Sequence, residues 1–224
     1  MTITRISRLG IVNAYLVPED DGLTLIDTGL PRTRARILAA AKSLGLPIVR
    51  IALTHAHTDH AGSLDALTAE VPGVEVIVSE REAPLMTGDK SLRDGEPQDR
   101  VRGGFPVTTT VPTRTVNDGD HIGSLRVVAT RGHTPGHISL IDTRDGTAYG
   151  GDVFTTRRGM ATSAVVSWRY PMAGLATWSH ELALQSARTL AELNPERLAP
   201  GHGDVVEQPA HAMNRAIATT AKRL

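Results

Sequence analysis

The segment LTHAHTDHAG, residues 53–62, carries three histidines and one aspartate within six positions: His55, His57, Asp59 and His60. Imidazole nitrogens and carboxylate oxygens bind divalent transition metals where thiolates are absent. The chain has no cysteine, so any metal must be held by these two kinds of group. The pattern H-x-H-x-D-H arises by chance on the order of once in a thousand such chains. We therefore predict a metal site here.

Three further candidate ligands lie far along the chain: His133 in RGHTPGH, Asp152 in YGGDVF and His202 in APGHGD. Each of these segments begins where a predicted strand ends, and glycines flank all of them. Ligands gather at strand ends in α/β sheets, so we expect all seven side chains to meet in one pocket. His137 is assigned a supporting or structural role. The other histidines are assigned no function: His121, His180 and His211.

Hydrophobic patterns predict the elements that position these residues. In the first half, they indicate four strands at 12–17, 23–27, 48–53 and 74–78, and two helices at 31–45 and 61–70. In the second half, strands are expected at 113–116, 125–130, 138–142, 147–150 and 197–199. One long helix is predicted over 175–193, before Pro195, and a last one over 209–223. The segment 87–112 is expected to be a lid or a long loop.

The order of these elements indicates an α/β fold in one domain, residues 1–224. Each half supplies strands with helices among them, which suggests two packed sheets with helices outside. A chain of 224 residues is long enough to bury a large core.

The charge balance argues against a polyanionic partner. Lys+Arg and Asp+Glu both total 24, so nucleic-acid binding is not expected. Arginines gather at 93–102, 126–131 and 157–169, and such runs are usually solvated faces. The N-terminus lacks an apolar stretch of signal-peptide length, and no apolar run approaches a membrane span. We expect a cytoplasmic protein that acts on a small molecule.

From LIDTGL (residues 25–30) to PGHGD (residues 200–204), the motifs together resemble those of the metallo-β-lactamase fold hydrolases. This resemblance implies a four-layer αβ/βα sandwich and two metal ions. By that similarity, the first metal would be held by His55, His57 and His133, and the second by Asp59, His60 and His202. Asp152 would bridge the two metals. Asp27, in IDTG, would support the site without binding metal.

Two such ions can share a hydroxide and make a nucleophile at neutral pH, while one of them polarises a substrate carbonyl. Asp59 is then placed to pass a proton to the leaving group. Zinc suits these ligands best, and iron or manganese also fits.

This sequence differs from several subfamilies of the metallo-β-lactamase fold, and the differences reduce the number of functions that the resemblance allows. True β-lactamases resemble this chain in the first cluster but lack the bridging aspartate. Glyoxalase II has the same seven ligands but adds a C-terminal helical domain, and only 20 residues follow PGHGD here. Flavodiiron-type proteins have glutamate in place of His57, and nucleases of the fold add an arm or domain. The chain most resembles the lactonase and small-ester branch.

Three functions remain open from the sequence. The leading one is hydrolysis of an ester, lactone or thioester. Phosphodiester hydrolysis is the second, suggested by Arg157, Arg158 and Arg169. The third is oxygenation of a persulfide by one bound iron.

Within 155–173, the apolar residues are expected either to line a substrate pocket or to pack beneath the site: Met160, Val165, Val166, Trp168 and Tyr170. Related lactonases suggest that Tyr170 donates a hydrogen bond to the substrate carbonyl.

Overall fold

The first half of the chain forms a mostly parallel group of strands in the computed structural model, which describes residues 3–168 and 170–224. These strands are β1 Thr4–Arg8, β2 Val12–Glu19, β3 Gly22–Ile26, β4 Ile48–Ala52, β5 Glu75–Ser79 and β6 Arg114–Val116. Their order is β6-β5-β4-β3-β2, with β1 paired to β2. The steps from β3 to β6 are parallel, whereas β1, β2 and β3 form antiparallel pairs.

The second half forms a mostly antiparallel group. Its strands are β7 His121–Ile122, β8 Leu125–Ala129, β9 Ile138–Asp142, β10 Thr147–Thr155, β11 Ala161–Thr162, β12 Arg197–His202 and β13 Val206–Glu207. They follow the order β12-β10-β9-β8-β7, and only β10 with β12 is parallel. A single residue pair, Val12 with His202, joins β2 to β12 and so connects the two groups.

Three apolar clusters separate four layers. The cluster between the two strand groups takes Tyr15, Ile26 and Ile77 from the first half and Leu140 and Tyr149 from the second. The two tyrosine rings meet edge to face, with centroids 5.3 Å apart. A second cluster lies under the helices of the first half, and a third lies under those of the second. The predicted αβ/βα sandwich is therefore confirmed.

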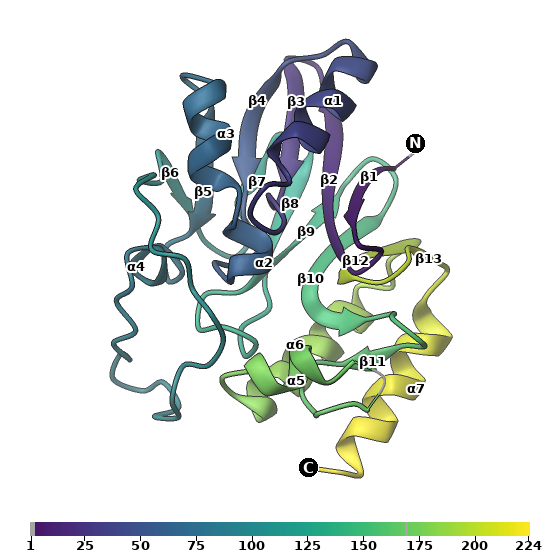
Figure 1. Cartoon of the computed structure of the whole chain (residues 1–224). Coiled ribbons are helices and arrows are strands. Elements are labelled where there is room, and N and C mark those ends of the chain that lie inside the picture. Colours follow the sequence, from purple (N-terminus) through teal and green to yellow (C-terminus); the bar gives the residue numbers. More distant parts are fainter. Residues whose placement is uncertain (1–2, 169) are drawn as a thin grey trace.

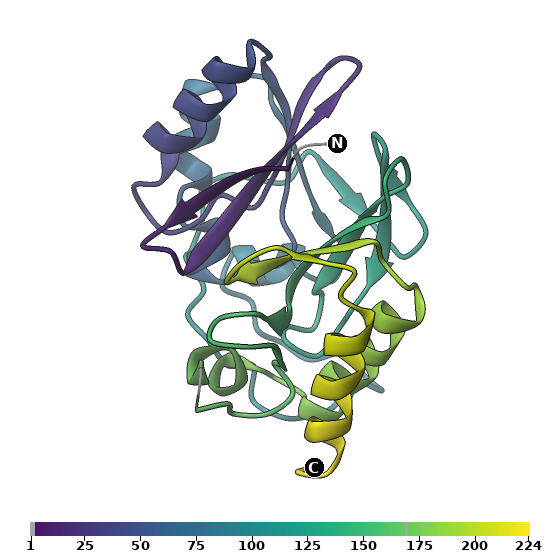
Figure 2. The same ribbon diagram turned by 90° about the vertical axis from the view of Figure 1, so that its right-hand side faces the viewer.

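The helices cover opposite sides of the strands (Figures 1 and 2). The first half supplies α1 Arg34–Leu44, α2 Thr58–Ala61, α3 Leu64–Glu70 and α4 Ala83–Met86. The second half supplies α5 Pro171–Ala176, α6 His180–Glu192 and α7 Ala210–Ala221. Among the described residues, no helix is both long enough and apolar enough to cross a membrane.

The prediction of one helix over 175–193 is wrong, because the chain breaks between α5 and α6. The break turns the backbone toward the loop after β8: Trp178 N–H donates to the His133 carbonyl, at 3.0 Å, and Ser179 N–H donates to the Gly132 carbonyl, at 2.8 Å. The Ser179 side chain also caps α6 by accepting from Leu182 N–H. The helix predicted at 61–70 begins three residues later, as α3 Leu64–Glu70, and the short helix α2 Thr58–Ala61 precedes it.

The segment 87–112, which we call the strap, contains no helix or strand. Side chains from the body of the protein bind it at several places along its length. Arg81 forms a two-pronged ion pair with Glu96 near its start, and Trp178 Nε1–H donates to the Asp99 carbonyl. Near its end, the carboxylate of Asp65 accepts from the backbone of residues 109 and 110. The strap is therefore a long loop fastened along its length.

The cluster between the strand groups contributes to the stability of the fold through fully buried apolar side chains. Leu140 is fully buried there, and Leu140→Ala is expected to lower the free energy of unfolding by about 2–5 kcal/mol in urea denaturation. Leu44→Ala on α1, where the leucine is 37% exposed, should cost roughly 0.5 kcal/mol or less. Equal losses in the two variants would contradict this assignment of the core.

Candidate metal centre

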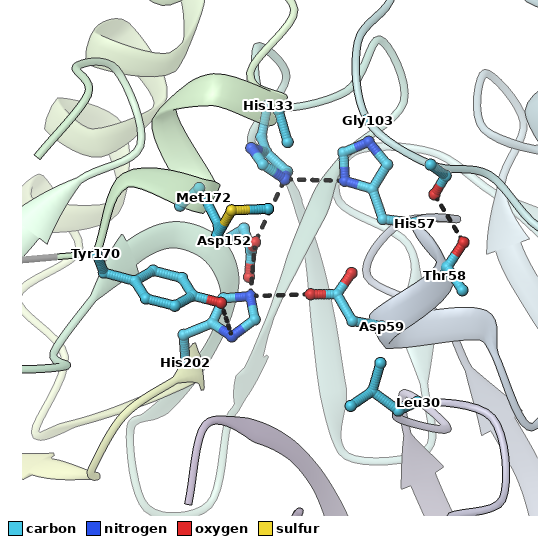
Figure 3. A pocket seen from close by; sticks show the side chains of 13 residues that line it. Leu30, His57, Thr58, Asp59, Gly103, His133, Asp152, Tyr170, Met172 and His202 are labelled. Carbon is cyan, nitrogen blue, oxygen red and sulfur yellow. Dashed lines mark hydrogen bonds and ion pairs between the residues drawn. The ribbon is translucent and has the colours of Figure 1, made fainter. Parts of the chain in front are cut away.

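The seven residues singled out in the sequence meet at one end of the strands. Segments that follow β4 and β8 carry His55, His57 and His133, and α2 carries Asp59 and His60. His202 is the last residue of β12. Figure 3 shows five of the seven side chains pointing into one pocket: His57, Asp59, His133, Asp152 and His202.

Asp152 reaches the pocket by a route that differs from the prediction. It was expected after a strand ending at residue 150, but β10 continues to Thr155. The register with β12 shifts on both sides of Gly151, whose φ is +49°. This irregularity places Asp152 among the histidines while the strand continues. A Cβ on Gly151 would lie 2.5 Å from the His137 ring, so only glycine fits there.

The ligand atoms fall into three overlapping groups. His55, His57 and His133 offer nitrogens within 4.8 Å of one another. The same limit holds for the group Asp59, His60 and His202, and for the group His55, His60 and Asp152. Asp152 lies between the first two groups: Oδ2 is 3.3 Å from His133 Nε2 and 3.1 Å from His202 Nε2. This arrangement could hold two cations that share one carboxylate.

Buried atoms without hydrogen-bond partners support a fit to metal. His55 Nε2, His60 Nε2 and Asp152 Oδ1 are buried and have no hydrogen bond. Leaving such atoms unpaired costs about 1–3 kcal/mol each. All three face the same small volume, as their membership of one ligand group shows. Two divalent cations in this volume would give each of them a partner, so the residues fit a dinuclear metal site.

Hydrogen bonds behind three of the rings direct their Nε2 lone pairs into the site. Asp27 accepts from His60 Nδ1–H at 2.7 Å, in the supporting position that the resemblance implied. Thr54 Oγ1 donates to Asp27, so it accepts from His55 Nδ1–H. Thr177 Oγ1 donates to backbone carbonyls, so it accepts from His133 Nδ1–H. Such partners fix which nitrogen binds a metal.

The other two candidate rings are held by backbone carbonyls. His57 Nε2–H donates to the Arg102 carbonyl at 3.1 Å, which leaves its Nδ1 facing His133 Nε2 at 3.0 Å. His202 Nδ1–H donates to the Ile11 carbonyl at 3.0 Å. All five candidate imidazoles therefore point one lone pair at the site. Thr177, Arg102 and Ile11 were missed from the sequence, because backbone carbonyls and a single threonine carry no motif.

His137 is buried beside the site but has no free nitrogen. Its Nε2 accepts from the backbone N–H of Asp152 at 3.0 Å, and its Nδ1–H donates to Thr130 Oγ1 at 2.9 Å. It therefore positions the backbone of Asp152 and is not a ligand. The three histidines that were assigned no function lie outside the ligand groups found among the described residues: His121, His180 and His211.

The electrostatics divide the histidines into two sets. Burial lowers the pKa of His57 to about 4 and that of His55 and His133 well below the usual range, so these rings are neutral. Burial also opposes charge on His202, but Asp152 and then Asp59 raise its pKa to about 9. The carboxylates of Asp152 and Asp59 therefore favour positive charge around His202, either as a proton on the imidazole or as a metal cation.

The pocket over these ligands is a cavity of about 300 Å³. Leu30, Met172, Ala173 and Ala176 form its apolar wall, and Tyr170 lies beside His202 with Oη 3.2 Å from Nδ1. Figure 3 shows the Tyr170 hydroxyl directed at the site from the side opposite His57. Burial raises the pKa of Tyr170, so its hydroxyl keeps its proton.

The apolar residues of 155–173 were expected either to line this pocket or to pack beneath the site, and most of them do not line it. Of the five residues named, only Tyr170 lines the pocket. Met160, Val165 and Trp168 line a separate cavity against α7, because the segment folds back there and Thr162 bonds to Thr220. Val166 is partly exposed and lines neither cavity.

The strap forms the remaining wall. Gly103 and Gly104 line the pocket, and the Gly104 carbonyl accepts from Thr58 N–H at 2.8 Å. Gly103 has φ +86°, and a Cβ there would lie 2.2 Å from His57 Nε2. The Phe105 ring packs on the His57 imidazole, with centroids 4.6 Å apart. The strap therefore holds His57 in place.

Comparison with known proteins agrees with the fold. The model of the metallo-beta-lactamase superfamily matches residues 7–202, and the chain belongs to that superfamily. It is 45% identical over 212 residues to the uncharacterized protein YobT of Bacillus subtilis (strain 168), covering 94% of this chain and 91% of YobT. It is 28% identical to the probable metallo-hydrolase YflN of the same strain, covering 86% and 81% of the two chains.

Solved structures show the same architecture. TTHA1623, crystallised in a di-iron-bound form, superposes with a TM-score of 0.70 at 27% identity, covering 95% of this chain and 97% of the other. The BLEG-1 B3 metallo-beta-lactamase gives a TM-score of 0.70 at 23% identity, with 94% and 96% of the two chains covered. The chain is therefore a metal-dependent hydrolase by family.

The contact between Gly103 and His57 can be tested by Gly103→Ala. The added methyl group must displace the imidazole, so metal affinity is expected to fall about 10-fold or more. Gly95→Ala is the matched control: Gly95 has a similar φ of +82°, but a Cβ there has no atom within 4 Å. Metal titration of the chelator-treated proteins measures both, and equal affinities in the two variants would contradict the role of the strap.

Proposed function

We propose that this protein hydrolyses an uncharged ester, lactone or thioester with two divalent metals. The observation that carries the proposal is the convergence of five imidazole lone pairs and two aspartates on one volume beside an apolar pocket. His55, His57 and His133 would hold one metal, and Asp59, His60 and His202 the other. Asp152 would bridge them.

The pocket favours a neutral substrate. Among the described residues that line it, none is lysine or arginine. Arg157 donates to the Gly10 carbonyl instead, Arg158 is exposed, and Arg169 lies outside the described residues. A phosphodiester carries negative charge that this lining does not neutralise. Phosphodiester hydrolysis is therefore the weaker candidate.

A complete second ligand group disfavours the oxygenase alternative. One iron held by three histidines would leave Asp59, His60 and His202 without a use, yet these three are arranged as closely as the first group.

Two relatives named hydroxyacylglutathione hydrolases, from Haemophilus influenzae and Stenotrophomonas maltophilia, are 30% and 29% identical to this chain over 63% and 62% of its length. Their names support hydrolysis of an acyl compound.

The bound metals would supply an activated water at neutral pH and a Lewis acid for the substrate carbonyl. In hydrolysis, the water oxygen forms a bond to the acyl carbon, the bond from that carbon to the leaving oxygen or sulfur breaks, and the leaving group takes up a proton. Asp59 faces the pocket and is partly exposed, so it can carry that proton.

Tyr170 would orient the substrate carbonyl in this proposal. Because His202 Nδ1–H donates to the Ile11 carbonyl, the Tyr170 hydroxyl proton is not needed by the imidazole and can be donated to the substrate. A neutral donor fixed beside the apolar wall of the pocket would stabilise the negative charge that develops on the carbonyl oxygen. The apolar wall with Leu30 and Met172 would hold the acyl group.

Zinc is the metal we propose, since histidine and aspartate ligands suit it. Iron is the alternative, because TTHA1623 was solved in a di-iron-bound form.

Elemental analysis of the purified protein should give two transition-metal ions per chain. Dialysis against a chelator should abolish activity, and added zinc should restore it. A ratio near one iron per chain without zinc would favour the oxygenase.

The reaction class is tested with a panel of substrates. We expect turnover of uncharged aryl esters, lactones or thioesters, and turnover at least about 100-fold lower for a bis-aryl phosphate. Hydrolysis of the phosphodiester with none of the acyl substrates would refute the proposal in favour of the second candidate.

Removing the Tyr170 hydroxyl separates its role from that of the metals. Tyr170→Phe is expected to lower kcat roughly 100-fold with unchanged metal content, because the Ile11 carbonyl still holds His202. Tyr149→Phe, in the core between the strand groups, is the control and should retain the wild-type kcat. Unchanged turnover in Tyr170→Phe would remove this residue from the mechanism.

A further inference from the structure

Glu82 is a fully buried carboxylate that the proposed reaction does not use. Its exposed fraction is 0%, and it does not line the pocket. It lies at the end of the turn between β5 and α4. Burial raises its pKa to about 7, which shows how unfavourable the ionised form is at this position. A side chain of this kind needs compensating donors.

Three donors surround the carboxylate. Oε1 accepts from Ala56 N–H at 2.8 Å. Oε2 accepts from Thr134 Oγ1–H at 2.7 Å and from Gly136 N–H at 2.9 Å. The positive charge of Arg81 also acts on this carboxylate, but Arg81 is itself paired with Glu96 in the strap. The carboxylate of Glu82 is therefore held chiefly by hydrogen bonds.

These donors belong to the two loops that carry the first group of candidate ligands. Ala56 lies between His55 and His57, and Thr134 follows His133. The backbone contact is also close: a Cβ on Gly136 would lie 2.3 Å from the backbone nitrogen of Glu82. One side chain thus bonds to both loops at once.

We propose that Glu82 is a positioning residue that fixes the spacing of His55 and His57 relative to His133, and so builds the first metal position. This inference rests on the proposed function, since it takes those three histidines as one ligand set. The second set has direct support of its own, from Asp27 behind His60 and from the Ile11 carbonyl behind His202. Glu82 therefore acts chiefly on the first metal position.

The glutamine variant tests this role with little change of shape. In Glu82→Gln, one carboxylate oxygen becomes an NH₂ group, so at least one of the two backbone amides faces a donor in place of an acceptor. The loops must then move apart at this point. Glu80→Gln is the matched control, because Glu80 is two residues away, exposed, and paired with Arg93 at the surface.

Cobalt titration of the chelator-treated proteins provides a readout that is independent of activity. We expect wild type and Glu80→Gln to bind two Co²⁺ ions with the same visible absorption spectrum. Glu82→Gln should bind one ion as wild type does and the other about 10–100-fold more weakly, with a changed spectrum for the weak site. If both ions bind to Glu82→Gln with wild-type affinity and spectrum, the proposal is wrong.

A second variant decides the question if Glu82→Gln does not fold. Thr134→Val removes one donor and keeps the carboxylate, and it should weaken the same ion by a smaller factor. Unchanged binding in Thr134→Val would then overturn the role of Glu82. Wild-type protein that binds fewer than two ions would instead refute the proposed function. The two failures are therefore distinguishable.

Discussion

The site depends on one constraint: the Asp152 carboxylate is buried and surrounded by histidine ring nitrogens. Its two oxygens lie 3.1–3.3 Å from nitrogens of His60, His133 and His202. Such a carboxylate is unfavourable inside a protein unless positive charge accompanies it. Hydrogen bonds to the outer nitrogens of these three rings keep their inner nitrogens directed at the carboxylate. The fold therefore keeps a cation-binding site, although burying this carboxylate without a cation destabilises the folded protein.

The architecture explains how distant residues share this place. The two strand groups meet through one residue pair, Val12 with His202, and the cluster around Tyr15 and Tyr149 holds them face to face. Loops from both groups then open at the same end (Figure 1). Each half contributes ligands to the site, so packing between the halves sets the distances on which the chemistry depends.

Much of this could be predicted from the sequence. The spacing of His55, His57, Asp59 and His60 is local, so the pattern itself indicated a metal site, and strand-end positions indicated that His133 and His202 would join it. The break at Thr177 could not be predicted, because helix periodicity continues across it and the cause is a tertiary contact with the His133 loop. The continuation of β10 past Asp152 and the role of the Arg102 carbonyl depend on tertiary contacts in the same way.

Anomalous scattering from crystals of the metal-loaded protein tests the central claim most directly. The account predicts two anomalous peaks roughly 3.5–4 Å apart, one among His55, His57 and His133 and the other among Asp59, His60 and His202, with Asp152 between them. A single peak at one of these positions, or peaks away from Asp152, would contradict it.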